Sequence, residues 1–117
     1  MVEIVRQRLV ELAQAGRWAH YAEVGALVNL NMASPGDRTR LSSVLDSISR
    51  DEFRDGRPLL SAVVILSGTN PPMPGNGFFT MARQIGAFTG GSREDAQRFH
   101  QAELERVFEH WQNEISV

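Results

Sequence analysis

The chain has 117 residues, of which 42% are hydrophobic and 22% charged, and this balance predicts one folded domain over residues 1–117. It contains no cysteine, and all twelve basic residues are arginine, which excludes disulfides, thiolate metal ligands and any chemistry that needs a lysine amine. The net charge of −2 argues against a strongly electrostatic nucleic-acid binder.

Nothing in the sequence predicts a membrane segment. No apolar run reaches the roughly 18 residues that a spanning helix needs. The N-terminus alternates charged and apolar side chains, unlike a signal peptide. We therefore expect a cytoplasmic protein that does not associate with membranes.

Three helices are predicted in the first half of the chain. Apolar residues recur at helical spacing over 2–15 and again, more briefly, over 21–28, and residues 29–34 are expected to form a loop. Ser34, Pro35 and Asp37 then form a typical helix start, with an apolar stripe following over 41–48. This third helix is expected to fade near Arg50. A charged connection should follow over 51–56, with Phe53 turned inward.

Residues 59–66 carry the strongest strand signal. Seven of these eight residues are apolar, and the Val-Val-Ile content favours a strand that is buried on both faces. A lone strand leaves its backbone groups unpaired, so it needs a partner. Residues 77–79 could return as a short hairpin arm. The alternative is a strand from a second copy of the chain, which would make the protein a homodimer.

The last third of the chain is predicted to be helical. Residues 78–85 fit a short helix as well as they fit the hairpin arm, and residues 89–91 are a clear break. A second capping pattern, from Ser92 to Asp95, opens a long helix over about 93–115. We expect its apolar stripe to pack against the core: Leu104, Val107, Phe108, Trp111 and Ile115.

The predicted fold is therefore a mostly helical α+β domain. It has three N-terminal helices, one buried strand with a short hairpin partner, and a long C-terminal helix, which is the order of a winged helix. The segment Trp18-Ala-His-Tyr21-Ala-Glu-Val-Gly-Ala-Leu resembles the helix-turn-helix entry of alkyltransferase-like proteins. The reactive Pro-Cys-His-Arg motif of that family is absent. The resemblance thus implies a DNA-facing module and no methyl-transfer chemistry.

The loop over 67–77 is the first candidate site. Gly75 and Gly77 suggest a phosphate cradle, but Thr80 stands where a dinucleotide motif needs glycine, and the chain has no lysine for a Walker motif. Prolines 71, 72 and 74 stiffen the loop, which suits a preformed contact surface. We predict that a protein partner binds here, at Asn70, Pro72, Met73, Pro74 and Asn76.

The histidines do not predict a metal site. His100 and His110 share one side of the last helix, but ten residues separate them by roughly 15 Å, too far for one ion. No nucleophile–histidine–acid order is evident, so a small enzyme that uses His20 or His100 is a minor hypothesis. We predict neither a catalytic residue nor a metal or other cofactor.

The arginines raise an alternative function. If residues 35–50 form a recognition helix, its N-terminal residues would face duplex DNA. The predicted nucleic-acid contacts are Arg38, Arg40, Arg54 and Arg57, although five acidic residues balance the five arginines within 35–57.

The function that the sequence favours is protein binding without catalysis. Residues 91–117 carry three arginines against six acids, which makes the last helix acidic. The leading prediction is an accessory, adaptor or immunity-type bacterial protein that binds its partner through the 67–77 loop and this helix. The alternative is a winged-helix DNA-binding protein.

Overall fold

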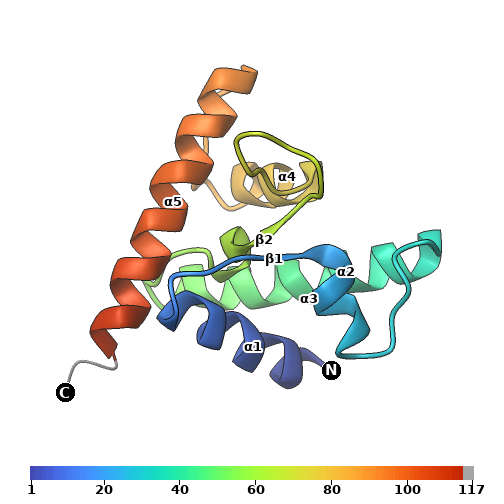
Figure 1. Ribbon diagram of the computed structural model, residues 1–117. Coiled ribbons are helices and arrows are strands. Elements are labelled where there is room, and N and C mark those ends of the chain that lie inside the picture. The colour runs from blue at the N-terminus through green and yellow to red at the C-terminus, as the bar shows by residue number, and fades with distance from the viewer. Residues whose placement is uncertain (115–117) are drawn as a thin grey trace.

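The computed structural model describes residues 1–114, and it is a mostly helical α+β structure, as predicted (Figure 1). The described elements are α1 (Val2–Gln14), β1 (Ala19–His20), α2 (Tyr21–Ala26), α3 (Pro35–Arg54), the 3-10 helix η1 (Leu60–Val63), β2 (Val64–Ile65), α4 (Asn76–Gln84) and α5 (Arg93–Glu114).

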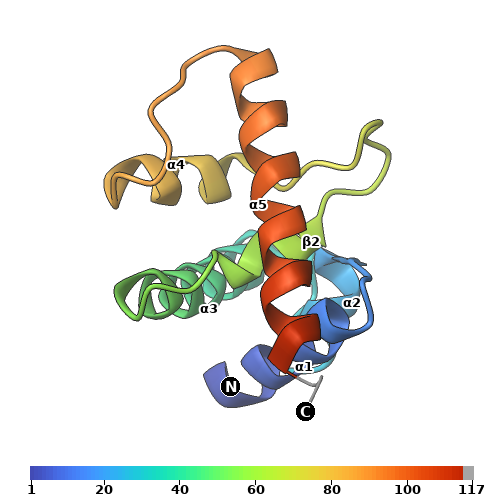
Figure 2. The same ribbon diagram turned by 90° about the vertical axis from the view of Figure 1, so that its left-hand side faces the viewer.

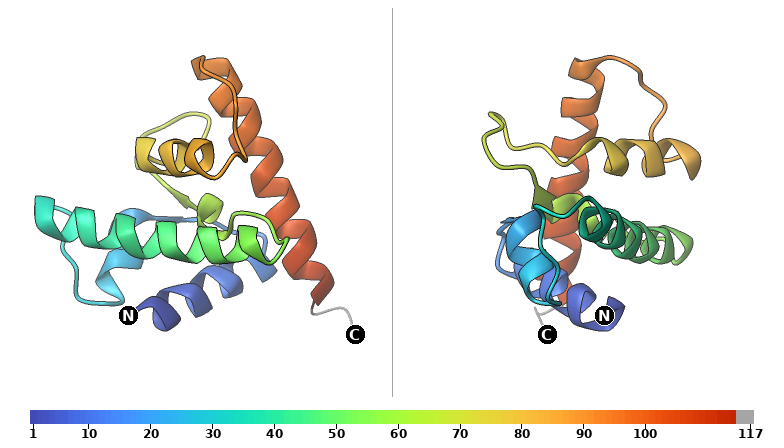
Figure 3. Two further views of the ribbon diagram at one scale, coloured as in Figure 1. Left: turned by 180° about the vertical axis from the view of Figure 1, so that it is seen from behind. Right: turned by 90° about the vertical axis from the view of Figure 1, so that its right-hand side faces the viewer.

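The buried segment η1 lies at the centre of the molecule. Helices α1, α3 and α5 all contact it, and α1 also packs on both α3 and α5. Figures 1 and 2 show α1 and α3 on one side of β2 and α4 on the other side. Helix α5 extends along the molecule from the level of α1 to beyond α4. The same arrangement is seen from behind in Figure 3. Residues 59–65 are therefore enclosed on every side, and each is at most 5% exposed.

Helix capping follows the predicted pattern fully at α5 and in part at α3. At the start of α5, Asp95 N donates to Ser92 Oγ (3.0 Å) while Asp95 Oδ2 accepts from Ser92 N (3.3 Å), which confirms the capping box. At the start of α3, Ser34 Oγ accepts from Asp37 N (3.4 Å). The Asp37 carboxylate instead accepts from the main-chain nitrogen of Asn31 (2.9 Å), so it fastens the preceding loop.

The end of α3 differs from the prediction. The helix continues to Arg54, and Phe53 is 43% exposed, so both the predicted end near Arg50 and the inward Phe53 are wrong. The extra turn places Glu52 on the buried face, with its side chain 0% exposed. Arginines 6 and 57 neutralise this carboxylate, which explains how an acidic residue can occupy that face.

The predicted burial of residues 59–66 is confirmed for 59–65, but most of the predicted strand is wrong. Residues 60–63 form a 3-10 helix, and only Val64 and Ile65 are extended. Their partner is the parallel strand β1, with Ala19 beside Val64 and His20 beside Ile65. The predicted hairpin arm, residues 77–79, instead lies within α4, in agreement with the alternative reading of that segment as a helix.

Side chains take over the backbone pairing that a longer strand would have needed. Leu59 N donates to Glu103 Oε2 (2.8 Å), and Ser61 N donates to Ser49 Oγ (3.0 Å). The carbonyl of Ala62 accepts from His100 Nε2 (2.9 Å). Buried backbone groups must find partners, and here α3 and α5 provide them. The last member of the predicted α5 stripe, Ile115, lies outside the described residues.

We expect His100 to make stability depend on pH. Burial lowers the pKa of His100 below its usual 6.5, while the Ala62 carbonyl and Glu103 oppose that shift. The unfolded chain therefore binds a proton more readily, and folding stability should fall as the pH drops below about 6.5. Urea denaturation at pH 7.5 and 5.0 measures this loss. The His100→Gln variant keeps a hydrogen-bond donor for Ala62, and its free energy of unfolding should fall less between pH 7.5 and pH 5.0. A decrease equal to that of the wild type would contradict this role of His100.

Candidate functional site

The loop over residues 66–75 is closed on itself at its base. Leu66 N donates to Met73 O (2.9 Å). The hydroxyl of Thr69 donates to Leu66 O (3.4 Å) and accepts from Met73 N (3.1 Å). Figure 2 shows the loop extending away from the helices. Its tip is thus held out on a fixed base, with Asn70 and Pro71 exposed.

A cavity of about 340 Å³, the tyrosine cavity, lies between α2, α3 and the start of α4. The hydroxyl of Tyr21 accepts a hydrogen bond from Gly75 N (2.8 Å), which ties the loop to α2. Gly77 lies so close to Ser42 that an added Cβ would stand 3.2 Å from its hydroxyl oxygen. The lining is part polar and part apolar, and it includes Tyr21, Arg38, Ser42, Asp46, Leu66 and Phe78.

Burial perturbs both acidic groups of the tyrosine cavity. It raises the pKa of Asp46, an effect that the charge of Arg50 opposes. It also raises the pKa of the Tyr21 hydroxyl, against the effect of the Gly75 hydrogen bond, and the Asp46 charge adds to the increase. Tyr21 therefore keeps its proton at neutral pH and remains a hydrogen-bond donor at the cavity wall.

A second cavity, the arginine cavity, lies on the other side of the loop and has a volume of about 500 Å³. It is bounded by the loop, by the outer face of α4 and by the start of α5. Leu66 lines both cavities and is 42% exposed, so the loop forms a common wall between them. Other lining residues of the arginine cavity are Thr69, Met73, Phe79, Thr80, Arg83 and Arg93.

The residues predicted to bind a partner are not equally accessible. Asn70 and Asn76 are exposed, Pro72 and Met73 are half-buried, and Pro74 is buried. Met73, Pro74 and Asn76 line the arginine cavity. The structure therefore brings three of the five predicted residues together at one cavity and leaves Asn70 at the loop tip.

The four arginines predicted to contact nucleic acid divide into two pairs. Arg54 forms an ion pair with Asp51 (3.0 Å), and Arg57 pairs with Glu52 and Asp55. Arg38 instead donates to the carbonyl of Met32 (3.0 Å). Arg40 is exposed and has no hydrogen bond or ion pair to any residue within 1–114.

Neither histidine of the minor enzyme hypothesis lines these two cavities. His100 is 2% exposed and bonded to Ala62, while His20 precedes α2 and its main-chain nitrogen donates to Glu23 Oε1 (3.2 Å). Within residues 1–114, no group of three histidine, aspartate or glutamate side chains could hold a metal ion. What the cavities offer chemically is hydrogen bonding, apolar contact and charge.

Among the cavity-lining residues that sequence reasoning missed are Tyr21, Asp46, Arg83 and Arg93. The sequence position of Asp46 could have indicated a place at the cavity, because Asp46 lies one turn after Ser42 and beside the apolar stripe of its helix. Arg83 and Arg93 gave no such signal, because they are ten positions apart and a glycine-rich break lies between them. Only the folding of α4 against α5 places them at one cavity.

No protein-family model matches the sequence, and no curated protein or solved structure shows significant similarity to it. None of the helices in residues 1–114 is both long enough and apolar enough to cross a membrane.

Proposed function

We propose that this protein is a non-enzymatic binding module that recognises a partner protein through the loop over 66–75 and the adjoining Asn76. The observation that carries the proposal is the loop itself. It is fastened at its base by three hydrogen bonds, its tip is exposed, and a cavity lies on each side of its base. A contact surface that is already ordered loses little conformational entropy on binding.

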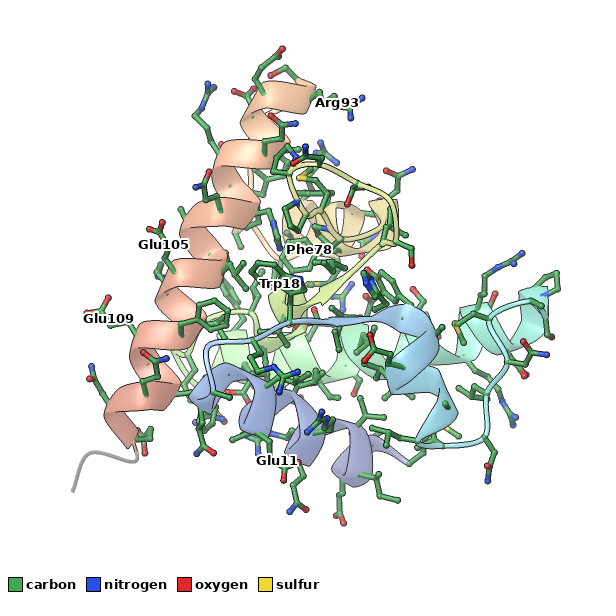
Figure 4. All side chains as sticks on the ribbon, viewed as in Figure 1. Glu11, Trp18, Phe78, Arg93, Glu105 and Glu109 are labelled. Carbon is green, nitrogen blue, oxygen red and sulfur yellow. The ribbon has the colours of Figure 1, made fainter. Side chains whose placement is uncertain are left out.

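The acidic last helix is a less suitable contact surface for the same partner. Glu105 and Glu109 project from the outer side of α5, away from α4 and the loop (Figure 4). The partner would therefore meet the loop and its two cavities first. We place the centre of the proposed interface there, with Asn70 and Asn76 as its exposed polar residues.

DNA binding through α3 is the second candidate. The observation in its favour is that Arg38 and Arg40 are exposed near the start of α3 and form no ion pair with any residue within 1–114. A recognition helix uses its N-terminal residues in this way. The resemblance of residues 18–27 to a helix-turn-helix entry points the same way, whereas the hairpin of a winged helix is absent from residues 1–114 because residues 77–79 lie in α4.

Site-specific photo-crosslinking tests the leading proposal. A photoreactive amino acid at Asn70 or Asn76, introduced in cells that normally make the protein, should capture one and the same partner. The matched control is Gln7, an exposed residue of α1. The purified partner should bind the wild-type protein and bind the Asn70→Arg variant more weakly. Capture from Gln7 alone, or equal binding of the variant, would contradict the proposal.

A fluorescence anisotropy titration with duplex DNA distinguishes the second candidate. Salt-sensitive binding that weakens in Arg38→Ala and Arg40→Ala, together with no capture from the loop, would favour DNA over a protein partner.

A further inference from the structure

We propose that the arginine cavity receives an acidic segment of the partner protein, with an aspartate or glutamate carboxylate bound by Arg83 and Arg93. This inference rests on the proposed function, because it identifies the chemistry of the segment that the loop would recognise. It follows from the orientation of Arg83, the absence of acidic residues from the cavity lining, and the apolar surface beside the two arginines.

Arg83 is held in place with its binding end free. Its Nε donates to the carbonyl of Gly90 (3.3 Å), and its guanidinium lies over the ring of Phe88, 4.8 Å from the centroid. Neither contact takes an N–H donor of the terminal Nη atoms, and Arg83 forms no ion pair within residues 1–114. A guanidinium fixed in this way loses little rotamer freedom when its free edge binds a carboxylate.

The charge at this cavity is unbalanced. Arg93 opens α5, is exposed and has no hydrogen bond or ion pair to another described residue. None of the described residues that line the cavity is acidic, although the whole chain has a net charge of −2. The nearest capping carboxylate, Asp95, already accepts from Gly91 N, Ser92 N and Arg98. Glu94 is exposed and does not line the cavity.

The rest of the lining favours a peptide over a nucleic acid. Leu66, Met73 and Phe79 give the cavity an apolar part, which suits hydrophobic residues that flank an acidic one. Thr80 adds a hydroxyl for a main-chain group of the peptide, whereas the hydroxyl of Thr69 is already engaged within the loop. Binding to a phosphate backbone relies on many basic residues along a surface, whereas this cavity has two. Two arginines fit a short acidic segment.

The test uses a fluorescein-labelled peptide of alternating glutamate and leucine, with the glutamine version as its control. By fluorescence anisotropy at low salt, the glutamate peptide should bind at least tenfold more tightly. Arg83→Gln and Arg93→Gln should each weaken binding about tenfold, because each removes charge-assisted hydrogen bonds. The matched control is Arg17→Gln, which removes an exposed arginine that lines neither cavity, and it should bind like wild type.

Three results would overturn the inference. They are equal binding of the glutamine peptide, equal weakening by Arg17→Gln, and tighter Arg83-dependent binding of a labelled oligonucleotide. Circular dichroism confirms that each variant is folded. The photo-crosslinked partner separates this inference from the proposed function. If the partner is captured from Asn70 as well by the Arg83→Gln/Arg93→Gln variant as by wild type, the loop proposal stands and the acidic-segment inference fails.

Discussion

Replacing Arg6 and Arg57 together by methionine is expected to lower the free energy of unfolding by about 3–5 kcal/mol. Both arginines bind the carboxylate of Glu52, which is 0% exposed: Arg6 through Nη2 at 2.7 Å, and Arg57 through Nε. The double replacement leaves a buried charge with no cation beside it, and such a charge is costly. Arg6 also lies over the ring of Trp111, 5.6 Å from its centroid, so α1, α3 and α5 all meet at this cluster.

Chemical denaturation of the two single variants and the double variant measures the energetic coupling between Arg6 and Arg57 at Glu52. Each single replacement leaves one arginine on Glu52, so the sum of the two single losses should be smaller than the loss in the double variant. The matched control is Arg54→Met, which breaks an exposed ion pair with Asp51 and should change stability by less than about 1 kcal/mol. If the double variant loses no more unfolding free energy than Arg54→Met, the cluster contributes little to stability.

Truncating Leu60 to alanine is expected to cost about 2–5 kcal/mol. Leu60 is 0% exposed and begins η1, the segment that α1, α3 and α5 all contact. The residues around η1 are hydrogen-bonded to α3 and α5, so the neighbouring elements cannot move far enough to fill the cavity that the truncation leaves. This cost is a large part of the 5–15 kcal/mol that stabilises a typical domain.

Thermal or urea denaturation measures the effect of Leu60→Ala. Leu27→Ala removes the same atoms from a side chain that is 48% exposed, and it should cost no more than about 0.5 kcal/mol. Equal losses in the two variants would contradict the central role given to η1.

Local sequence patterns were sufficient to predict most of the helices. Apolar spacing and capping residues located α1, α2, α3 and α5 within a few residues, and the Ser92–Asp95 capping box marked the start of α5 correctly. The segment of α4 fits a hairpin arm as well as a helix, so the sequence alone does not decide its structure. Residues 59–65 could be predicted as buried, but the 3-10 helix over 60–63 could not, because apolar residues on all sides fit either structure. One of the partners that replace strand pairing is Glu103, whose carboxylate binds the main chain of a residue 44 positions earlier. No local pattern indicates such a partner.

The candidate site was predictable only in part. The prolines and glycines between 67 and 77 marked the loop correctly, because these residues restrict the backbone wherever they occur. The cavities on either side could not be predicted from the same evidence. Tyr21 and Gly75, which meet across the tyrosine cavity, are 54 positions apart. A contact of this kind depends on how the helices pack, and helix packing cannot be predicted from any one local segment of the sequence.

The dependence of η1 on α5 has a consequence for how the protein is made. Leu59 N and Ala62 O find their partners in Glu103 and His100, both on the last helix described. While the ribosome is still synthesising α5, these two backbone groups have no native partner. The segment η1 then contacts α1 and α3 but lacks its contacts with α5. We therefore expect the nascent chain to remain incompletely folded until α5 has emerged from the ribosome.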